Sequence, residues 1–241
     1  MDPITALAAS GLRARMESLD LLANNVANAS TGGFKADREF YSLYSGEDNS
    51  DTVPSTMPVI ERPWTDYTQG TLQRTGNTLD FALDGHGFFA VNGPSGPLYT
   101  RNGSFRLGGD GRLITSDGYA VRNRQGGAIQ LDANRDVQVG PDGTITQDGK
   151  VIGQLEIVDF TSTGGLAKQG AAYFRIADPT LRPSAPSTVT VEQGQVEGSN
   201  TGSAEAAVRL VSVMRQFEML NKAATLGAEM NKRAIEEVAK V

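Results

Sequence analysis

The chain contains a single histidine, His86, which is the first candidate for acid–base or metal chemistry. A metal site would need further strong ligands, but the 241 residues include no cysteine and no second histidine. A serine–histidine–aspartate triad would also have to use His86, and no Gly-x-Ser-x-Gly motif accompanies it. A structural role in a turn is therefore favoured, and we expect no catalytic and no metal-binding residues.

Three other patterns could carry chemistry, and each has a structural explanation that fits better. Gly85–Ala90 matches the dinucleotide motif Gly-x-Gly-x-x-Ala, but the residues that follow read as a strand and not as the required helix. Asp80 and Asp84 could form a carboxylate pair for glycoside hydrolysis, yet nothing nearby supports this. The repeated Asp-Gly pairs lack the alternating oxygen ligands of a calcium loop, so hairpin turns are expected instead. We predict that the chain is not an enzyme and binds no cofactor.

The charge balance excludes further classes of function. Lysine and arginine number 22 and aspartate and glutamate 28, which gives a net charge of −6 and makes phosphate contacts with nucleic acid unfavourable. No apolar run approaches the roughly 20 residues that span a bilayer. The N-terminal residues lack a basic region and a long apolar stretch, so no cleaved signal peptide is expected.

The middle of the chain reads as β-structure. Short apolar runs alternate with Asp-Gly pairs, which are strong signals for hairpin turns. These pairs are Asp84-Gly85, Asp110-Gly111, Asp117-Gly118, Asp142-Gly143 and Asp148-Gly149. We predict a mainly β fold, with an irregular sandwich-like or barrel-like central domain over residues 69–177.

Both ends of the chain are predicted to be helical. Residues 2–30 carry apolar side chains every seven positions, and Pro3 suits a first helical position. Residues 203–240 follow a heptad spacing over about four repeats. We therefore expect residues 1–32 and 200–241 to form a coiled-coil-like assembly region. Extended connections are expected at 33–68, with a polar linker at 45–60, and at 178–199.

Neither helix belongs by position to the β-domain, so the apolar stripes must be buried on each other or on a neighbouring subunit. Three asparagines near the end of the first helix are poor helix formers, but their amides could fix the register against a partner helix or backbone. The predicted assembly residues are Leu12, Leu19, Leu22, Asn24, Asn25, Val26, Asn28, Leu210, Val213, Phe217, Leu220 and Ala224.

Several blocks of sequence resemble the bacterial flagellar rod and hook proteins. The run Leu21–Lys35, with Asn24-Asn25 and Gly32-Gly33-Phe34-Lys35, is similar to their N-terminal signature. Gln69–Gly85 resembles their central block, and Tyr99–Phe105 continues it. Glu197-Gly198-Ser199-Asn200 precedes the last helix, as in this family. The resemblance covers nearly the whole chain, and length and details favour the proximal-rod type.

This resemblance implies a structural subunit of the flagellar basal-body rod, the periplasmic drive shaft. It implies export through the flagellar type III apparatus without a cleaved signal, and partners among the other rod subunits. The terminal helices would form the inner coiled-coil layer of the tube. A distal-rod or hook-like subunit is the first alternative. A β-rich protein that acts on polysaccharide is a remote one, and it predicts a cleft lined by carboxylates.

Overall fold

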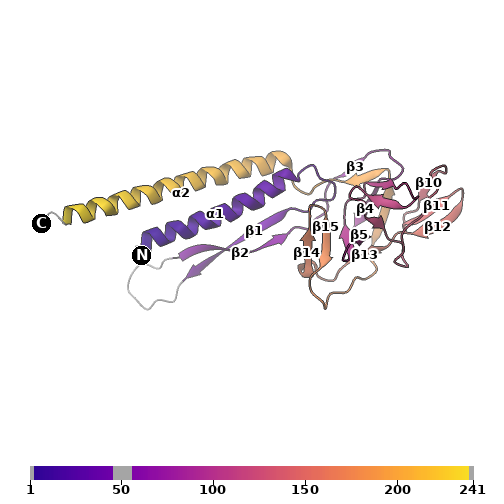
Figure 1. Cartoon of the computed structure of the whole chain (residues 1–241), viewed down its shortest axis with the longest axis horizontal. Helices are drawn as coiled ribbons and strands as arrows, with labels where there is room; N and C mark the ends of the chain where they lie inside the picture. Colours follow the sequence, from indigo (N-terminus) through magenta and orange to yellow (C-terminus); the bar gives the residue numbers. More distant parts are fainter. Residues whose placement is uncertain (1–2, 46–55, 239–241) are drawn as a thin grey trace. The chain divides into compact units, whose positions relative to one another are not determined.

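The computed structural model describes residues 3–45 and 56–238, with side chains described for 11–39, 63–230 and a few positions beyond (Figure 1). Helix α1 spans Pro3–Ala27, helix α2 spans Ser203–Val238, and the short 3-10 helix η1 spans Thr163–Gly165. The strands are β1 (Asp37–Ser45), β2 (Thr56–Thr65), β3 (Leu72–Arg74), β4 (Phe81–Gly85), β5 (Phe88–Gly93), β6 (Gly96–Thr100), β7 (Phe105–Leu107), β8 (Leu113–Thr115), β9 (Ala120–Val121), β10 (Val137–Val139), β11 (Thr144–Gln147), β12 (Lys150–Gln154), β13 (Ile157–Val158), β14 (Leu166–Gln169), β15 (Tyr173–Ile176), β16 (Val189–Gln193) and β17 (Gln195–Glu197).

The chain forms two compact units, each assembled from distant parts of the sequence. Unit 1 comprises Met1–Ala27, Asp37–Asp66 and Gly202–Val241, and unit 2 comprises Asn28–Ala36 and Tyr67–Thr201. In unit 1, α1 and α2 lie side by side and run in opposite directions, and the antiparallel hairpin of β1 and β2 lies along α1 (Figure 1).

Unit 2 is built from short antiparallel strands in several sheets. The largest sheet has eight strands, with the order β14-β15-β6-β5-β9-β8-β7 and with β13 paired to β5. Strands β10, β11 and β12 form a three-stranded sheet, while β16 pairs with β4 and β17 with β3. The prediction of a mainly β protein with a helix at each end is therefore confirmed.

Strand β5 separates two hydrophobic clusters because it is buried on both faces. Phe89 and Val91 point into the larger cluster, which also holds Phe81 and Leu113. Phe88 and Ala90 alternate with them and belong to a smaller, aromatic-rich cluster around Phe174. Alternation along a strand sends successive side chains to opposite faces, so a continuous apolar run such as Phe88–Val91 requires a core on each side.

Four of the five Asp-Gly pairs form the predicted hairpin turns. They connect β7 to β8, β8 to β9, β10 to β11 and β11 to β12, and each of these pairs of strands is antiparallel. At Asp148-Gly149 both residues have positive φ, 49° and 73°, which is the backbone of a two-residue type I′ turn.

The prediction for Asp84-Gly85 is wrong, because β4 pairs with β16 and not with β5. Gly85 has φ 107°, and a Cβ there would lie 2.4 Å from the carbonyl oxygen of Thr188. The glycine is thus needed for the close approach of the segment that leads into β16.

The segments predicted as extended connections contain paired strands. Residues 33–68 include β1 and β2, and residues 178–199 include β16 and β17. Part of the polar linker predicted at 45–60 falls on residues 46–55, outside the described residues. Helix α1 ends three residues before the predicted boundary, because Asn28 begins a turn in which its carbonyl accepts a hydrogen bond from the Thr31 amide at 3.0 Å.

Candidate assembly interface

The predicted stripe of α2 faces α1 of the same chain. A Cβ built on Gly11 of α1 would lie 3.7 Å from Leu220 Cδ1, so the glycine lets the two helices approach closely. Val213, seven residues before Leu220 and on the same face, is 6% exposed. Leu210, Phe217, Leu220 and Ala224 are half-buried.

The predicted residues of α1 are distributed in a similar way. Leu22 is buried, and Leu12, Leu19 and Val26 are half-buried. Of the two ways of burial expected from the sequence, the structure shows the two helices in contact with each other. The two helices face each other and cover part of each other's apolar surface, because the chain returns α2 antiparallel to α1.

The asparagines at the end of α1 have separate roles. Asn25 is buried and pairs with the backbone of Asp37 in both directions, since its Nδ2 donates to Asp37 O at 2.8 Å and its Oδ1 accepts from Asp37 N at 3.0 Å. This contact joins the end of α1 to the start of β1 within the same chain. Asn28 lies in the turn after α1, and Asn24 is exposed.

A polar contact missed from the sequence connects three elements of unit 1. The hydroxyl of Ser18, which is fully buried on α1, donates to Glu39 of β1. Arg209 of α2 lies 3.8 Å from the other Glu39 oxygen. Hydrogen bonds to a charged group are worth about 1.5–3 kcal/mol, so Glu39 helps to hold the hairpin and both helices together.

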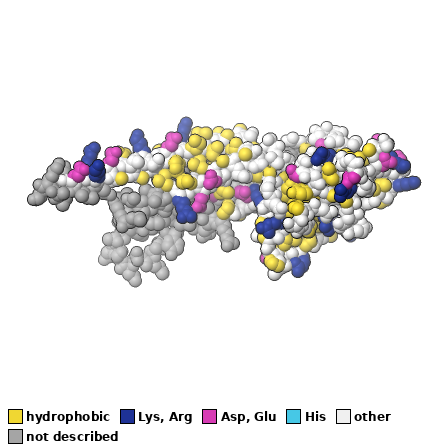
Figure 2. Space-filling model, viewed as in Figure 1, with side chains coloured by type: hydrophobic (Ala, Val, Ile, Leu, Met, Phe, Trp, Pro, Cys, Tyr) yellow, Lys and Arg dark blue, Asp and Glu magenta, His cyan; other side chains and the backbone are white. Residues whose placement is uncertain are grey.

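The other side of α2 carries a second apolar surface, which sequence reasoning also missed. Val208 is 72% exposed and Met219 is 64% exposed, and the helical period of 3.6 residues per turn places both away from Val213 and Leu220. We call this surface the outer face of α2, and it comprises Val208, Val211, Met219, Leu226 and Met230. Figure 2 shows hydrophobic side chains along this helix.

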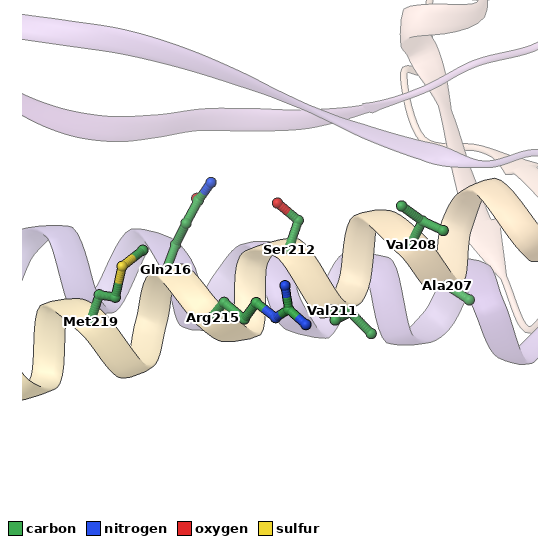
Figure 3. Close-up of a pocket in the computed structure, with 7 residues that line it drawn as sticks. All are labelled: Ala207, Val208, Val211, Ser212, Arg215, Gln216 and Met219. Carbon is green, nitrogen blue, oxygen red and sulfur yellow. The ribbon is translucent and has the colours of Figure 1, made fainter.

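A groove of ≈ 550 Å³ runs along the outer face, and the residues with described side chains that line it are seven residues of α2, from Ala207 to Met219 (Figure 3). In the close-up, Ser212 and Gln216 project from one side of the helix and Val211 lies on the other. Arg215 is the charged residue among them. A surface of exposed valine and methionine around one cation fits a protein partner, since large exposed apolar surfaces mark interaction sites.

Unit 2 contains a buried ionic cluster that joins distant segments. Lys35 and Glu197 have no exposed side-chain surface, and Arg101 is almost as buried. Glu197 Oε1 accepts from Lys35 Nζ at 2.5 Å, and Oε2 accepts from Arg101 Nη1 at 3.1 Å. Burial lowers the pKa of Arg101, while the carboxylate of Glu197 opposes this shift. The sequence places Lys35 and Glu197 in two recognisable blocks, but gives no local signal that they meet.

The alternatives that involve chemistry find little support in the described residues. His86 is exposed in the loop between β4 and β5, and among the residues that the structure describes no group of three or more His, Asp or Glu side chains could hold a metal ion. Asp142 and Glu156 are among the residues that line a pocket of ≈ 220 Å³. However, hydrogen bonds from Thr144 lower the pKa of Asp142, opposite to the need of a general acid, and Glu156 pairs with Arg122 at 2.6 Å.

No helix in the described part of the chain has the length and apolar character needed to cross a membrane.

Comparison with known proteins shows the family to which the chain belongs. Three family models match, described as "Flagella basal body rod protein" (residues 7–35), "Flagellar hook protein FlgE/F/G D1 domain" (82–147) and "Flagellar basal body rod FlgEFG protein C-terminal" (192–237). The last model covers most of α2, including its outer face.

Curated relatives match along most of the chain. The flagellar basal-body rod protein FlgF of Caulobacter vibrioides is 31% identical over 230 residues, which is 92% of each chain. FlgG of Bacillus subtilis is 31% identical over 252 residues, covering 92% of this chain and 93% of the relative. FlgF of Mesorhizobium japonicum is 32% identical over 214 residues, 88% of each chain. With relatives this similar over most of their length, the chain belongs to the family of flagellar basal-body rod proteins.

Proposed function

We propose that the chain is a rod subunit that polymerises through its terminal helices, with the outer face of α2 as the surface that meets a neighbouring rod subunit. The observation that carries this proposal is the two-sided character of α2. One side, with Val213 and Leu220, lies against α1, while the other side exposes Val208 and Met219. A helix with apolar residues on both sides is expected to be buried on both sides in the working state.

The heptad spacing of α2 gives this contact a geometry. We propose that α2 packs between α1 of its own chain and a helix of the next subunit, as in a coiled-coil layer. A contact of this kind uses different surfaces on the two partners, so repetition produces an open helical array and not a closed dimer. Residues 1–32 and 200–241 would form the assembly region and 69–177 the body of the subunit.

The relatives are structural rod proteins and not enzymes, so the chain is a structural component of the flagellum. We propose that it is of the proximal-rod type. FlgG relatives match with the same identity as FlgF relatives, so a distal-rod subunit is the second candidate. We further propose a periplasmic rod location, reached through the flagellar type III export apparatus without a cleaved signal. A chain free of cysteine suits an export route that requires the unfolded state, since it forms no disulfide before export.

The experiment replaces outer-face residues and measures incorporation into basal bodies. A strain without its own copy would produce the variant Val208→Ser/Met219→Ser, and purified basal bodies would be probed for the chain. Each apolar side chain that is buried contributes about 1.5–3 kcal/mol, so losing two should abolish incorporation and swimming. Circular dichroism would show that the variant remains folded.

The matched control is Val151→Ser/Ile152→Ser on β12 of unit 2. Val151 is 69% exposed, similar to Val208, and Ile152 is also exposed. This control should be incorporated like the wild type. If the outer-face variant also reaches the rod at wild-type levels, the proposed contact surface is wrong.

A further inference from the structure

Residues 33–36 follow α1 and run through unit 2 beside the segment that precedes α2. The Gly33 amide donates to Glu197 O at 2.7 Å, and Phe34 O accepts from the Asn200 amide at 3.2 Å. The Ala36 amide donates to Asn200 Oδ1 at 2.7 Å. The backbone of this N-terminal segment is therefore held by residues 197–200, the C-terminal segment of unit 2.

The side chain of Lys35 adds further contacts between residues 33–36 and residues 197–200. Its Nζ donates to Glu197 Oε1 at 2.5 Å and to Thr68 O at 2.7 Å, and the same Oε1 accepts from the Gly70 amide at 2.9 Å. Arg101 makes its own contacts inside the β-structure, because its guanidinium also donates to Leu83 O and Gly85 O. The cluster thus holds two cations around one carboxylate.

This arrangement makes Glu197 the residue on which Lys35 depends most. Without the negative charge, the ammonium of Lys35 would remain buried next to the positive charge of Arg101. An uncompensated buried charge is strongly unfavourable. The ammonium of Lys35 lies at the end of a flexible side chain, and the short segment that carries it is expected to detach from unit 2. Arg101 keeps its carbonyl partners within the sheets and is expected to stay.

We propose that Glu197 is a coupling residue, which makes the docking of residues 33–36 on unit 2 conditional on the docking of residues 197–200. Residues 33–36 and 197–200, which are separated by most of the sequence, then become ordered together. Residues 33–36 stay undocked until the C-terminal segment is in place. This coupling concerns unit 2 alone and does not rest on the proposed assembly contact.

Other contacts of the segment oppose this proposal and make it testable. Phe34 is buried, Lys168 Nζ lies 4.5 Å from the centre of its ring, and Lys168 also donates to Lys35 O at 2.5 Å. These contacts come from β14 and do not involve the C-terminal segment. If they suffice, residues 33–36 will remain docked when Glu197 is neutralised.

The test is pulse labelling of lysine amines with acetic anhydride in the full chain, read by mass spectrometry. Exposed Lys150 gives the reference rate, and Lys35 should react far more slowly in the wild type. Glu197→Gln should speed the labelling of Lys35 by about tenfold or more, as expected from losing one hydrogen bond between charged groups. Glu192→Gln, on β16 outside the cluster, is the matched control and should leave the rate unchanged. Protection of Lys35 in Glu197→Gln equal to that in the wild type would overturn the proposal.

Coupling is reciprocal, which provides a second variant in case Glu197→Gln does not fold. Lys35→Met should speed hydrogen exchange of the Asn200 amide, which donates to Phe34 O, more than that of the Gly198 amide, which donates to Thr71 O. Equal exchange of the Asn200 amide in Lys35→Met and in the wild type would contradict the coupling.

Discussion

Lys35 Nζ and Glu197 Oε1 lie 2.5 Å apart although 162 positions separate the two residues in the sequence, and neither side chain has any exposed surface. Lys35 belongs to the first segment of unit 2, Asn28–Ala36, and Glu197 lies near the end of its second segment, Tyr67–Thr201, so this ion pair joins the two segments of unit 2. Its contribution to the free energy of unfolding can be compared directly with that of an exposed ion pair in the same unit.

Replacement of Lys35 by methionine should lower the free energy of unfolding by about 1.5–3 kcal/mol, because Glu197 keeps Arg101 but loses the charged hydrogen bond to its closest partner. Arg112→Met removes an ion pair with Asp110 whose partners are both about half exposed. That change should cost at most about 1 kcal/mol. Urea denaturation followed by circular dichroism measures both, and equal losses would show that the buried pair has no special weight.

Gly103 and Gly109 give a matched pair of glycine-to-alanine substitutions. A Cβ on Gly103 would lie 1.6 Å from the carbonyl oxygen of Phe81, whereas Gly109 has nothing within 4 Å and no positive φ. Gly103→Ala should cost about 3 kcal/mol or more, because the backbone of β4 must move. Gly109→Ala should leave stability unchanged or raise it by about 0.4–1 kcal/mol through the unfolded state. Similar urea midpoints for the two variants would contradict the close approach at Gly103.

The raised pKa of Tyr173 predicts that the folded chain loses stability in alkaline solution. Burial, and then the hydrogen bond from its hydroxyl to Asp117 at 2.7 Å, raise the pKa of Tyr173 well above its ordinary value. The folded-state pKa is above the unfolded value of about 10. The stability that protonated Tyr173 contributes to the folded state is therefore fully present below pH ~10 and is lost as the pH rises through the folded pKa.

The measurement is the urea midpoint at pH 7, 10 and 11. Tyr173→Phe should flatten the alkaline decrease, and Asp117→Asn should flatten it in part, since the negative charge of Asp117 is removed while the burial that raises the pKa of Tyr173 remains. A wild-type decrease that is unchanged in Tyr173→Phe would exclude this tyrosine as the source.

The two sides of α2 should respond differently to truncation in the unassembled chain. Val213→Ala removes two methyl groups from a buried position and should cost about 1–3 kcal/mol. Val208→Ala, on the outer face, should change stability by no more than about 0.5 kcal/mol. Thermal melts monitored at the helical circular-dichroism band report both, and a large loss for Val208→Ala would mean that the outer face is already covered within the chain.

Local patterns predicted the elements well, because their signals lie within a few residues. The heptads located both helices, and the Asp-Gly pairs located four hairpin turns of the central domain. The prediction of a hairpin turn at Asp84-Gly85 was wrong because a glycine is also needed where a distant segment approaches closely. Here that segment is the one that leads into β16. The pairing of β1 with β2 was missed because the polar residues between them suggested a linker.

Contacts between distant segments could not be predicted from one sequence. Lys35 and Glu197 each belong to a recognisable block, but nothing in either block indicates that the two side chains share a buried site. The outer face of α2 was hidden for another reason. Arg215 and Lys222 interrupt the spacing of its apolar residues, so the stripe that contains Val213 and Leu220 dominated the pattern.

The most direct test of the central claim is photo-crosslinking within assembled basal bodies. A photoreactive residue would be placed at Met219 on the outer face or, for comparison, at the similarly exposed Val151 of unit 2. The proposed contact predicts covalent adducts with rod subunits from position 219 and none from position 151. Basal bodies that contain the chain but yield adducts from position 151 alone would contradict assembly through α2.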